Sequence, residues 1–113
     1  MHELKIAEDL SVIVIDTALD NKLTKVTKVN IIFGQLIQIV PDIFEFAFRE
    51  IVRNSIAADA ELNIDIVHVK MKCVNCGSAF QPKENLFACN ICGSTDLEII
   101  QGKELFIKSI EGE

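Results

Sequence analysis

The sequence predicts an α+β fold, with two helices packed on a small sheet of about three strands and an inserted unit organised by four cysteines. Two segments repeat apolar residues at helical spacing, and further segments alternate apolar and polar residues as strands do. The cysteines form two CxxC pairs within residues 73–92, where other apolar residues are few. We therefore expect a main domain of residues 1–72 plus 97–113 and a smaller domain of residues 73–96.

The composition is that of a folded domain. Of 113 residues, 50% are hydrophobic and 25% are charged. The net charge of −6 argues against a protein whose main task is to bind nucleic-acid phosphates or an anionic membrane surface. The longest purely apolar run, from Val12 to Ile15, is far shorter than the ~20 residues that span a bilayer. The start MHELK lacks the basic and apolar regions of a signal peptide, so we expect a cytoplasmic location.

The first helix is predicted over residues 3–20, because polar residues recur along one side at helical spacing. This polar stripe consists of Lys5, Asp9, Asp16 and Asp20. The opposite, apolar side consists of Leu4, Ala7, Leu10, Val14 and Ala18. After a break at residues 20–22, residues 25–33 predict a strand that ends at Gly34.

The second helix is predicted to begin with Pro41, since proline suits the first helical position and Asp42 suits the positive end of the helix dipole. Its apolar face consists of Phe44, Ala47, Phe48, Ile51 and Val52. Phe46 belongs either to the core or to a surface that contacts a partner.

The remaining strands are predicted by alternation. Residues 62–71 alternate straight into the first cysteine, and residues 97–100 and 104–110 flank a turn around Gly102. The expected sheet contains the strands 25–33 and 62–71 and the C-terminal strand.

The four cysteines predict a metal site. Each pair is followed by glycine, as Cys73-Val-Asn-Cys76-Gly and Cys89-Asn-Ile-Cys92-Gly. Glycine supplies the positive φ of a tight turn that brings two thiolates to one ion. A segment of about twenty residues cannot build its own core, so a metal must organise it. Four thiolates bind Zn(II) tetrahedrally and leave no open position, which predicts a structural zinc site.

Three alternatives concern the same cysteines. Disulfides need an oxidising compartment, for which the sequence gives no indication. A rubredoxin-like iron site uses similar geometry, but nothing else in the chain suggests electron transfer. A thioredoxin-like motif would have one CxxC at the start of a helix.

The N-terminus is a second candidate ligand set. The α-amine of Met1, the amide nitrogen and Nδ1 of His2, and the backbone nitrogen or carboxylate of Glu3 can surround one square-planar cation, as Ni(II) or Cu(II) prefers. We expect the helix to begin at Leu4 and to hold this tripeptide at the surface. Taken alone, a histidine at position 2 is more often a solvated terminal residue.

The combination resembles a known family. The opening MHEL–IAEDL, the segment FGQLIQIVPDIFEFAFREIV, the two CxxCG pairs and the closing GKELFIKSIE are similar to the HypA/HybF nickel-maturation proteins of hydrogenase assembly. The likeness runs from Met1 to about Ile110. Two features depart from it: Lys5 stands where a small hydroxyl residue is common, and no histidine adjoins either CxxC.

The resemblance implies a metallochaperone that binds transferable Ni(II) weakly and delivers it to the large subunit of a nickel-iron hydrogenase, together with a maturation GTPase. It implies nickel ligands at Met1, His2 and Glu3. It also implies zinc ligands at Cys73, Cys76, Cys89 and Cys92. Some members also serve urease. A homodimer is left open.

Other residues indicate no enzyme, since no nucleophile–base pair, paired carboxylates or phosphate-binding loop is evident. His68 is expected on a strand and partly exposed, with a role as a further metal ligand as the alternative. A rival function is a zinc-ribbon module that binds nucleic acid or protein without nickel. A nucleic-acid binder should carry a basic stripe, but residues 71–93 contain only Lys72 and Lys83 against Glu84.

Overall fold

The computed structural model describes residues 2–82 and 87–113 and forms two compact units. The helical unit comprises Met1–Ile32, Ile39–Asp65 and Leu105–Glu113. The cysteine unit comprises Phe33–Gln38 and Ile66–Glu104. Within the described residues, neither helix has the length and apolar character that a membrane crossing requires. The predicted α+β class, with two helices, three-stranded sheets and a four-cysteine cluster, is confirmed.

Helix α1 covers His2–Asp20 and buries the predicted apolar stripe, with Ala7, Leu10, Val14 and Ala18 all inside. Two expectations about its start are wrong. The helix begins at His2 rather than Leu4, and the Leu4 side chain is 52% exposed. Glu3 is buried in place of Leu4, because its carboxylate accepts a hydrogen bond from the backbone N–H of Val40 at the start of α2.

Helix α2 covers Pro41–Val52, with the proline in its first turn as predicted. Phe44 and Phe48 are buried, and their rings lie 6.0 Å apart between centroids. Ile51, predicted on the apolar face, is 38% exposed, and Phe46 is 69% exposed and lies outside the core. The helix ends at Val52, where Ser55 donates its backbone N–H and hydroxyl to the Val52 carbonyl in a turn.

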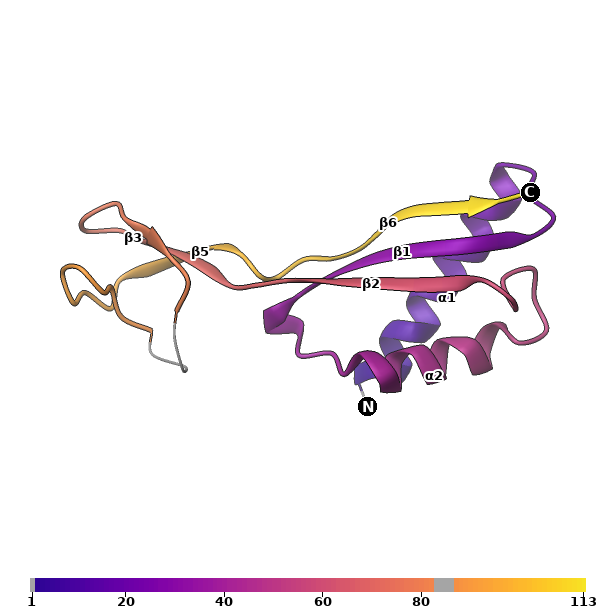
Figure 1. Ribbon diagram of the computed structural model, residues 1–113, viewed down its shortest axis with the longest axis horizontal. Helices are drawn as coiled ribbons and strands as arrows, with labels where there is room; N and C mark the ends of the chain where they lie inside the picture. Colours follow the sequence, from indigo (N-terminus) through magenta and orange to yellow (C-terminus); the bar gives the residue numbers. More distant parts are fainter. Residues whose placement is uncertain (1, 83–86) are drawn as a thin grey trace. The chain divides into compact units, whose positions relative to one another are not determined.

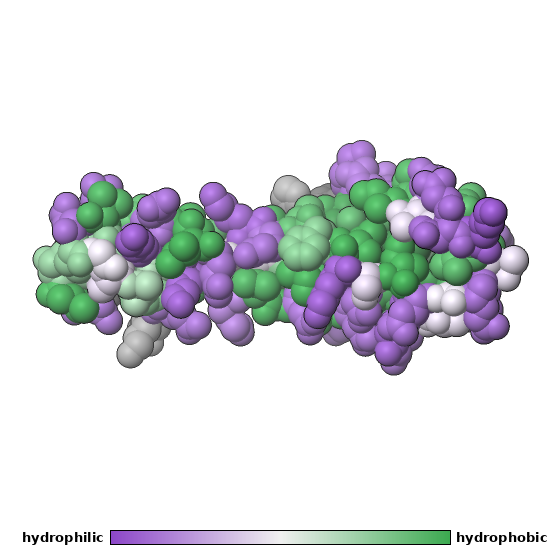
Figure 2. Space-filling view, turned by 90° about the horizontal axis from the view of Figure 1, so that it is seen from above, coloured by the Kyte–Doolittle hydropathy of each residue, from purple (hydrophilic) through white to green (hydrophobic). Residues whose placement is uncertain are grey.

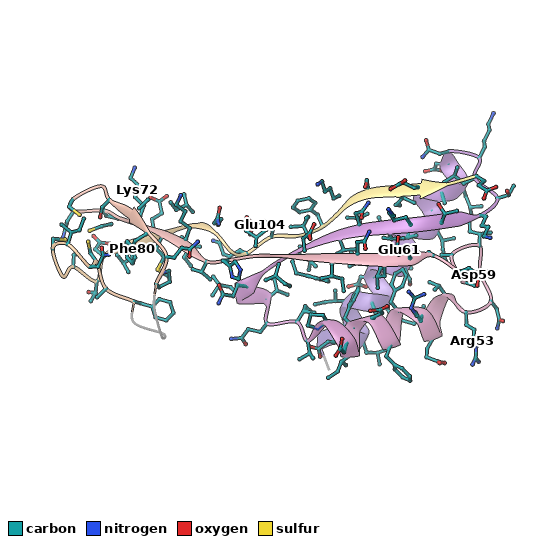
Figure 3. The ribbon with its side chains drawn as sticks, viewed as in Figure 1. Arg53, Asp59, Glu61, Lys72, Phe80 and Glu104 are labelled. Carbon is teal, nitrogen blue, oxygen red and sulfur yellow. The ribbon has the colours of Figure 1, made fainter. Side chains whose placement is uncertain are left out.

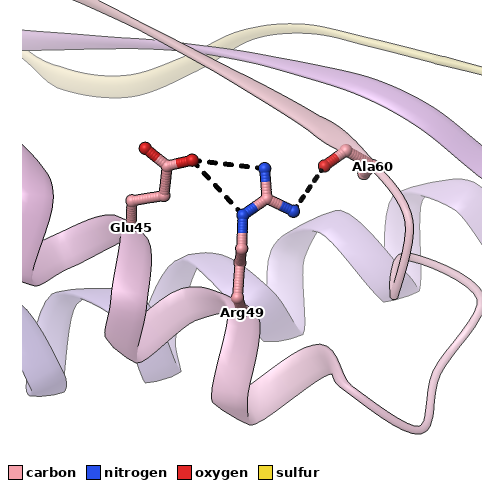
Figure 4. Close-up of polar contacts among 3 residues, drawn as sticks. All are labelled: Glu45, Arg49 and Ala60. Atoms are coloured by element: carbon pink, nitrogen blue, oxygen red, sulfur yellow. Dashed lines mark hydrogen bonds and ion pairs between the residues drawn. The ribbon is translucent and has the colours of Figure 1, made fainter.

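Arg49 fixes α2 to the segment that precedes the next strand (Figure 4). Its guanidinium donates to the Glu45 carboxylate at 3.2 and 3.3 Å and to the carbonyl of Ala60 at 3.0 Å. The helix is therefore tied along its own surface and across to the chain that enters the sheet.

The sheet of the helical unit has the order β2-β1-β6, formed by Glu61–Val67, Val26–Gly34 and Leu105–Gly112. In Figure 1, α1 runs behind these strands and α2 lies below them. The two helices contact each other, and α1 contacts β6. The core lies between helices and sheet, where β1 buries Val29 and Ile31.

The cysteine unit contains a second sheet, of order β4-β3-β5, with both neighbours antiparallel to β3. Its strands are β3 (Lys70–Cys73), β4 (Ala79–Phe80) and β5 (Leu97–Gln101). Lys72 and Phe80 mark β3 and β4 in Figure 3. A short 3-10 helix, Gln35–Ile37, belongs to the same unit.

The prediction of a single strand over residues 62–71 is therefore wrong. β2 ends at Val67, and β3 begins at Lys70 in the other sheet. At the break, the Val69 N–H donates to the Gln35 side chain at 2.8 Å, so it leaves the strand pairing without losing its hydrogen bond. Similarly, β5 and β6 flank Gly102 as predicted but pair in different sheets.

Candidate metal centre

The fold brings together the four cysteines that were predicted to bind a metal, at the end of the sheet β4-β3-β5. Their sulfur atoms all lie within 4.8 Å of one another. The distance between Sγ atoms is 3.5 Å for Cys73 and Cys92 and also for Cys76 and Cys89. All four are free cysteines, so the disulfide alternative is not realised. The sulfur atoms are the yellow sticks that gather in this unit in Figure 3.

Each pair sits in the same backbone turn. Gly77 and Gly93 have φ of 77° and 75°, which confirms the prediction that these positions need glycine. The Gly77 N–H donates to the Cys73 carbonyl at 2.9 Å, and the Gly93 N–H to the Cys89 carbonyl at 3.0 Å. Two equivalent knuckles therefore present their thiols to a common centre.

The distances fit a single tetrahedral ion. Four sulfurs at ~2.3 Å from a zinc ion would lie ~3.8 Å from each other, close to the separations found here. Cys73 and Cys89 are buried, whereas Cys76 and Cys92 are exposed. The cluster is a four-cysteine metal-binding group, and it is the one group of three or more candidate ligands among residues 2–82 and 87–113.

Hydrogen bonds already favour the thiolate form at part of the cluster. The pKa of Cys89 is lowered to about 5 by the Cys92 N–H, the Ser78 hydroxyl and the Ile91 N–H. The Ser78 hydroxyl and N–H also lower the pKa of Cys76. For Cys92, the Ser94 N–H lowers the pKa, but Cys73, burial and the other thiols together raise it to about 12. Four adjacent thiolates repel one another, and a bound cation relieves that repulsion.

At the N-terminus, Met1 lies outside the described residues, and His2 is the first residue of α1. Glu3 is buried, with 8% of its surface exposed. Its carboxylate accepts the Val40 N–H at 3.2 Å. Its own backbone N–H and that of Val40 hold the pKa of this carboxyl below its ordinary value of 4.5.

This contact caps α2 from another helix. Val40 is the N-cap residue of α2 and has no side chain that can accept a hydrogen bond. The Glu3 carboxylate instead accepts the N–H of the N-cap residue itself, as the N3 glutamate does in a capping box, and it places a negative charge at the positive end of the α2 dipole. The first turn of α1 is thereby attached to the start of α2.

An apolar groove of about 390 Å³ lies next to this attachment. It is lined by Leu4, Ile43, Phe46, Ala47, Glu50 and Ile51. Leu4 directly follows Glu3 in the chain, so the groove begins one residue after the N-terminal tripeptide. Apolar side chains also reach the surface of the cysteine unit, at the left of Figure 2, including Val74, Phe87 and Ile91.

His68 lies in the break between β2 and β3, not on a strand, and its side chain is exposed. Its carbonyl accepts the Gln101 side-chain N–H at 2.9 Å. It is not a member of the cysteine group found among the described residues.

Two polar residues of the cysteine site escaped the sequence analysis. Ser78 places its hydroxyl beside two of the sulfurs, and Ser94 accepts a hydrogen bond from Asn75 of the opposite knuckle. The signal that could have indicated them is the repeat itself, because both pairs read CxxCGS.

Comparison with known proteins gives a match over nearly the whole chain. Residues 1–112 match the family described as hydrogenase/urease nickel incorporation, metallochaperone, hypA. The chain is 36% identical over 113 residues to the hydrogenase maturation factor HypA of Aquifex aeolicus, covering all of this chain and 98% of that protein. It is 37% identical over 114 residues to HypA of Caldanaerobacter subterraneus, covering all of both.

Solved structures show the same fold. The solution structure of the Ni metallochaperone HypA from Helicobacter pylori is 27% identical, with a TM-score of 0.70, covering 99% of this chain and 97% of that one. A second solution structure of a HypA protein is also 27% identical, with a TM-score of 0.75, covering 100% and 97%.

Proposed function

Because the chain belongs to the HypA family of nickel-incorporation metallochaperones, we propose that it binds Ni(II) at its N-terminus and delivers it to a nickel-iron hydrogenase. The proposed ligands are the α-amine of Met1, the amide nitrogen and Nδ1 of His2, and the backbone nitrogen of Glu3. The observation that carries this proposal is the family match over residues 1–112. The chain holds and transfers the ion and has no catalytic role of its own.

The helical start of the chain suits this ligand set. N–H groups in the first turn of a helix take no part in the hydrogen-bond ladder of the helix, so Ni(II) can replace the amide protons of His2 and Glu3 without breaking that ladder. At Glu3 the ion would replace the contact of this N–H with the residue's own carboxylate. The Glu3 carboxylate is engaged with the Val40 N–H. This supports coordination through the backbone nitrogen of Glu3, with its carboxylate holding the turn in place.

Protons compete with nickel for these atoms. The α-amine and the imidazole have ordinary pKa values of ~7.7–8.0 and ~6.5. Nickel affinity therefore falls as the pH drops below about 7. At the edge of the domain, the thiolates of a receiving protein can displace the ligands one at a time, which makes the binding reversible.

We further propose that the four cysteines hold a structural Zn(II). A closed tetrathiolate leaves no position for a substrate, and the small cysteine unit needs a metal to be stable. Zinc has no redox chemistry, in keeping with a protein that carries a metal rather than electrons. Because thiolate ligands require reduced cysteines, we place the protein in the cytoplasm. The colour and metal content of purified protein distinguish zinc from iron.

The proposed partners are the large subunit of the hydrogenase and a maturation GTPase, with urease as a further recipient. We assign the GTPase to the apolar groove beside the tripeptide, because a partner seated on Leu4 and Phe46 would adjoin the nickel ligands. Phe46 is largely exposed, and phenylalanine is among the residues that are enriched at the core of protein interfaces. The alternative occupant of this groove is a second copy of the chain. Light scattering of the isolated protein detects such a homodimer.

The free amine tests the nickel proposal. Adding two residues before Met1 removes the α-amine from its chelate ring and leaves every side chain in place. We expect calorimetry to show at least a tenfold loss of Ni(II) affinity, whereas two residues added after Glu113 leave the affinity unchanged. Equal affinities of the two extended proteins would contradict the proposed ligand set.

The groove is tested separately. Phe46→Ala should weaken binding to the pathway's GTPase at least tenfold in calorimetry, since the variant removes the most exposed large side chain of the groove. Val12→Ala, on the outer side of α1 with 58% of its surface exposed, serves as the matched control. Equal binding by both variants would overturn the assignment of this surface.

A further inference from the structure

The two cysteine knuckles are equivalent in backbone but not in side chains. In each, the first cysteine donates its N–H to the carbonyl of the serine that follows glycine, from Cys73 to Ser78 and from Cys89 to Ser94, both at 2.8 Å. The two serines therefore hold the same backbone position. Their hydroxyls, however, contact different groups.

The Ser78 hydroxyl lies against sulfur. Its Oγ is 3.2 Å from the Sγ of Cys76, in its own knuckle, and 3.6 Å from the Sγ of Cys89, in the other. Once both cysteines are thiolates, the hydroxyl is the only donor in these contacts, because a thiolate has no proton to give. A hydrogen bond to a charged acceptor is stronger than a neutral one.

Among residues 2–82 and 87–113, the partners of the Ser94 hydroxyl are nitrogen atoms and not sulfur. It accepts the Asn75 side-chain N–H at 2.8 Å and the Asp96 backbone N–H at 3.1 Å. The Ser94 hydroxyl thus links the two knuckles through the side-chain amide of Asn75 and not through a cysteine sulfur. The chain therefore contains a matched pair of serines. The hydroxyl of Ser78 contacts cysteine sulfurs, and the hydroxyl of Ser94 contacts the neighbouring Asn75 and Asp96.

From this difference we infer that Ser78 is a positioning residue of the metal site, whose hydroxyl orients the thiolates of Cys76 and Cys89 and slows release of the ion. The inference rests on the proposed occupancy of the cysteines by zinc. Cys76 is exposed, so it is a point at which water or a competing ligand can reach the ion. A donor fixed on its sulfur opposes the departure of that ligand. Groups that hydrogen-bond to metal ligands typically contribute 10–100-fold to metal affinity.

The test follows zinc transfer from the full chain to a chromogenic chelator at neutral pH. Ser78→Ala should release zinc about tenfold faster than the wild type, whereas Ser94→Ala should stay within about twofold of it. Ser78→Thr, which keeps the hydroxyl, should restore slow release. Equal rates for the Ser78→Ala and Ser94→Ala variants would overturn the inference, and so would failure of threonine to rescue.

A second measurement separates orientation of ligands from general damage to the fold. In protein loaded with Co(II), loss of a hydrogen bond to sulfur makes the thiolate easier to oxidise and moves the sulfur-to-cobalt charge-transfer band to lower energy. We expect this shift in Ser78→Ala and not in Ser94→Ala, and the absence of a shift in Ser78→Ala would contradict the inference. A wild-type protein without zinc after purification would contradict the proposed function itself and remove the basis for a role of Ser78.

Discussion

Glu3 has a structural role in the fold beside its proposed role as a nickel ligand. Its side chain is buried where the stripe of α1 is otherwise apolar, and it accepts the Val40 N–H at the start of α2. The periodicity of the sequence places Leu4 on that stripe and cannot reveal the exchange. The choice between the two residues depends on a helix 37 positions away in the chain, which no local pattern contains.

Glu3→Gln tests the contribution of this carboxylate to stability. Because the folded-state pKa is lowered, the charged group stabilises the fold above its ordinary pKa of 4.5, and this contribution is lost as the pH falls through the folded-state value. We expect the variant to unfold at a lower temperature than the wild type at pH 7. The difference should shrink below pH 4.5. A difference that stays constant down to low pH would show that the charge is not responsible.

His2→Ala addresses the cargo site at the same scale. Loss of the imidazole should reduce Ni(II) affinity at least tenfold in calorimetry and leave the zinc content at the wild-type level, because the cysteines that we propose as zinc ligands belong to the cysteine unit. His68→Ala is the matched control and should leave nickel affinity unchanged. A large effect of His68→Ala, or none of His2→Ala, would show that the nickel ligands are misassigned.

At the scale of elements, α2 separates core from surface within three alternate phenylalanines. Phe44 and Phe48 are buried, and Phe46 between them is largely exposed. The helical spacing assigns Phe44 and Phe48 to the core, as predicted. It leaves Phe46 undecided, since an aromatic residue beside a core face can turn either way until the neighbouring helix is in place.

Phe48→Ala and Phe46→Ala should therefore differ in stability. The first variant loses a side chain that is 2% exposed and leaves a cavity, which should cost about 3–5 kcal/mol of unfolding free energy. The second should cost less than about 1 kcal/mol. Urea denaturation followed by helical circular dichroism measures both. Similar losses from the two substitutions would contradict the observed packing of α2.

The strands show a limit of prediction from sequence, which concerns the sheet that each strand joins. Within residues 62–71 the apolar positions change phase where Ile66 and Val67 adjoin, close to the point where β2 ends and the chain passes to β3 in the other sheet. Alternation indicates that a segment is extended, but its pairing partners lie far along the chain, so the change of phase alone does not reveal that the two parts join different sheets. The same holds for β5 and β6, whose bounds were predicted closely and whose separation into two sheets was not.

For the whole molecule, the two units have separate sources of stability. The helical unit buries two helix faces on its sheet, whereas the cysteine unit surrounds a small cluster of thiols. The spacing of the cysteines was enough to predict their convergence, because four ligands of one ion must meet. The division into a nickel-binding domain of residues 1–72 plus 97–113 and a zinc-binding domain of residues 73–96 stays a prediction.

Cys76→Ser tests the independence of the units. Removing one of four thiolates should release zinc and unfold the cysteine unit, since metal binding and folding are coupled in small metal-stabilised units. The helical unit should keep its core, so the circular dichroism of α1 and α2 should remain largely intact. Ser94→Ala, which leaves all four thiols in place, is the control. Loss of the helical signal in Cys76→Ser would show that the units depend on one metal.

The nature of the atoms around the cargo ion distinguishes delivery from the N-terminus from delivery through the cysteines. X-ray absorption at the nickel edge of the zinc-containing protein, loaded with one equivalent of Ni(II), identifies those atoms. We predict a square-planar shell of four nitrogen atoms, with no sulfur and with the zinc still bound by thiolates. Sulfur neighbours around nickel would contradict binding by Met1, His2 and Glu3.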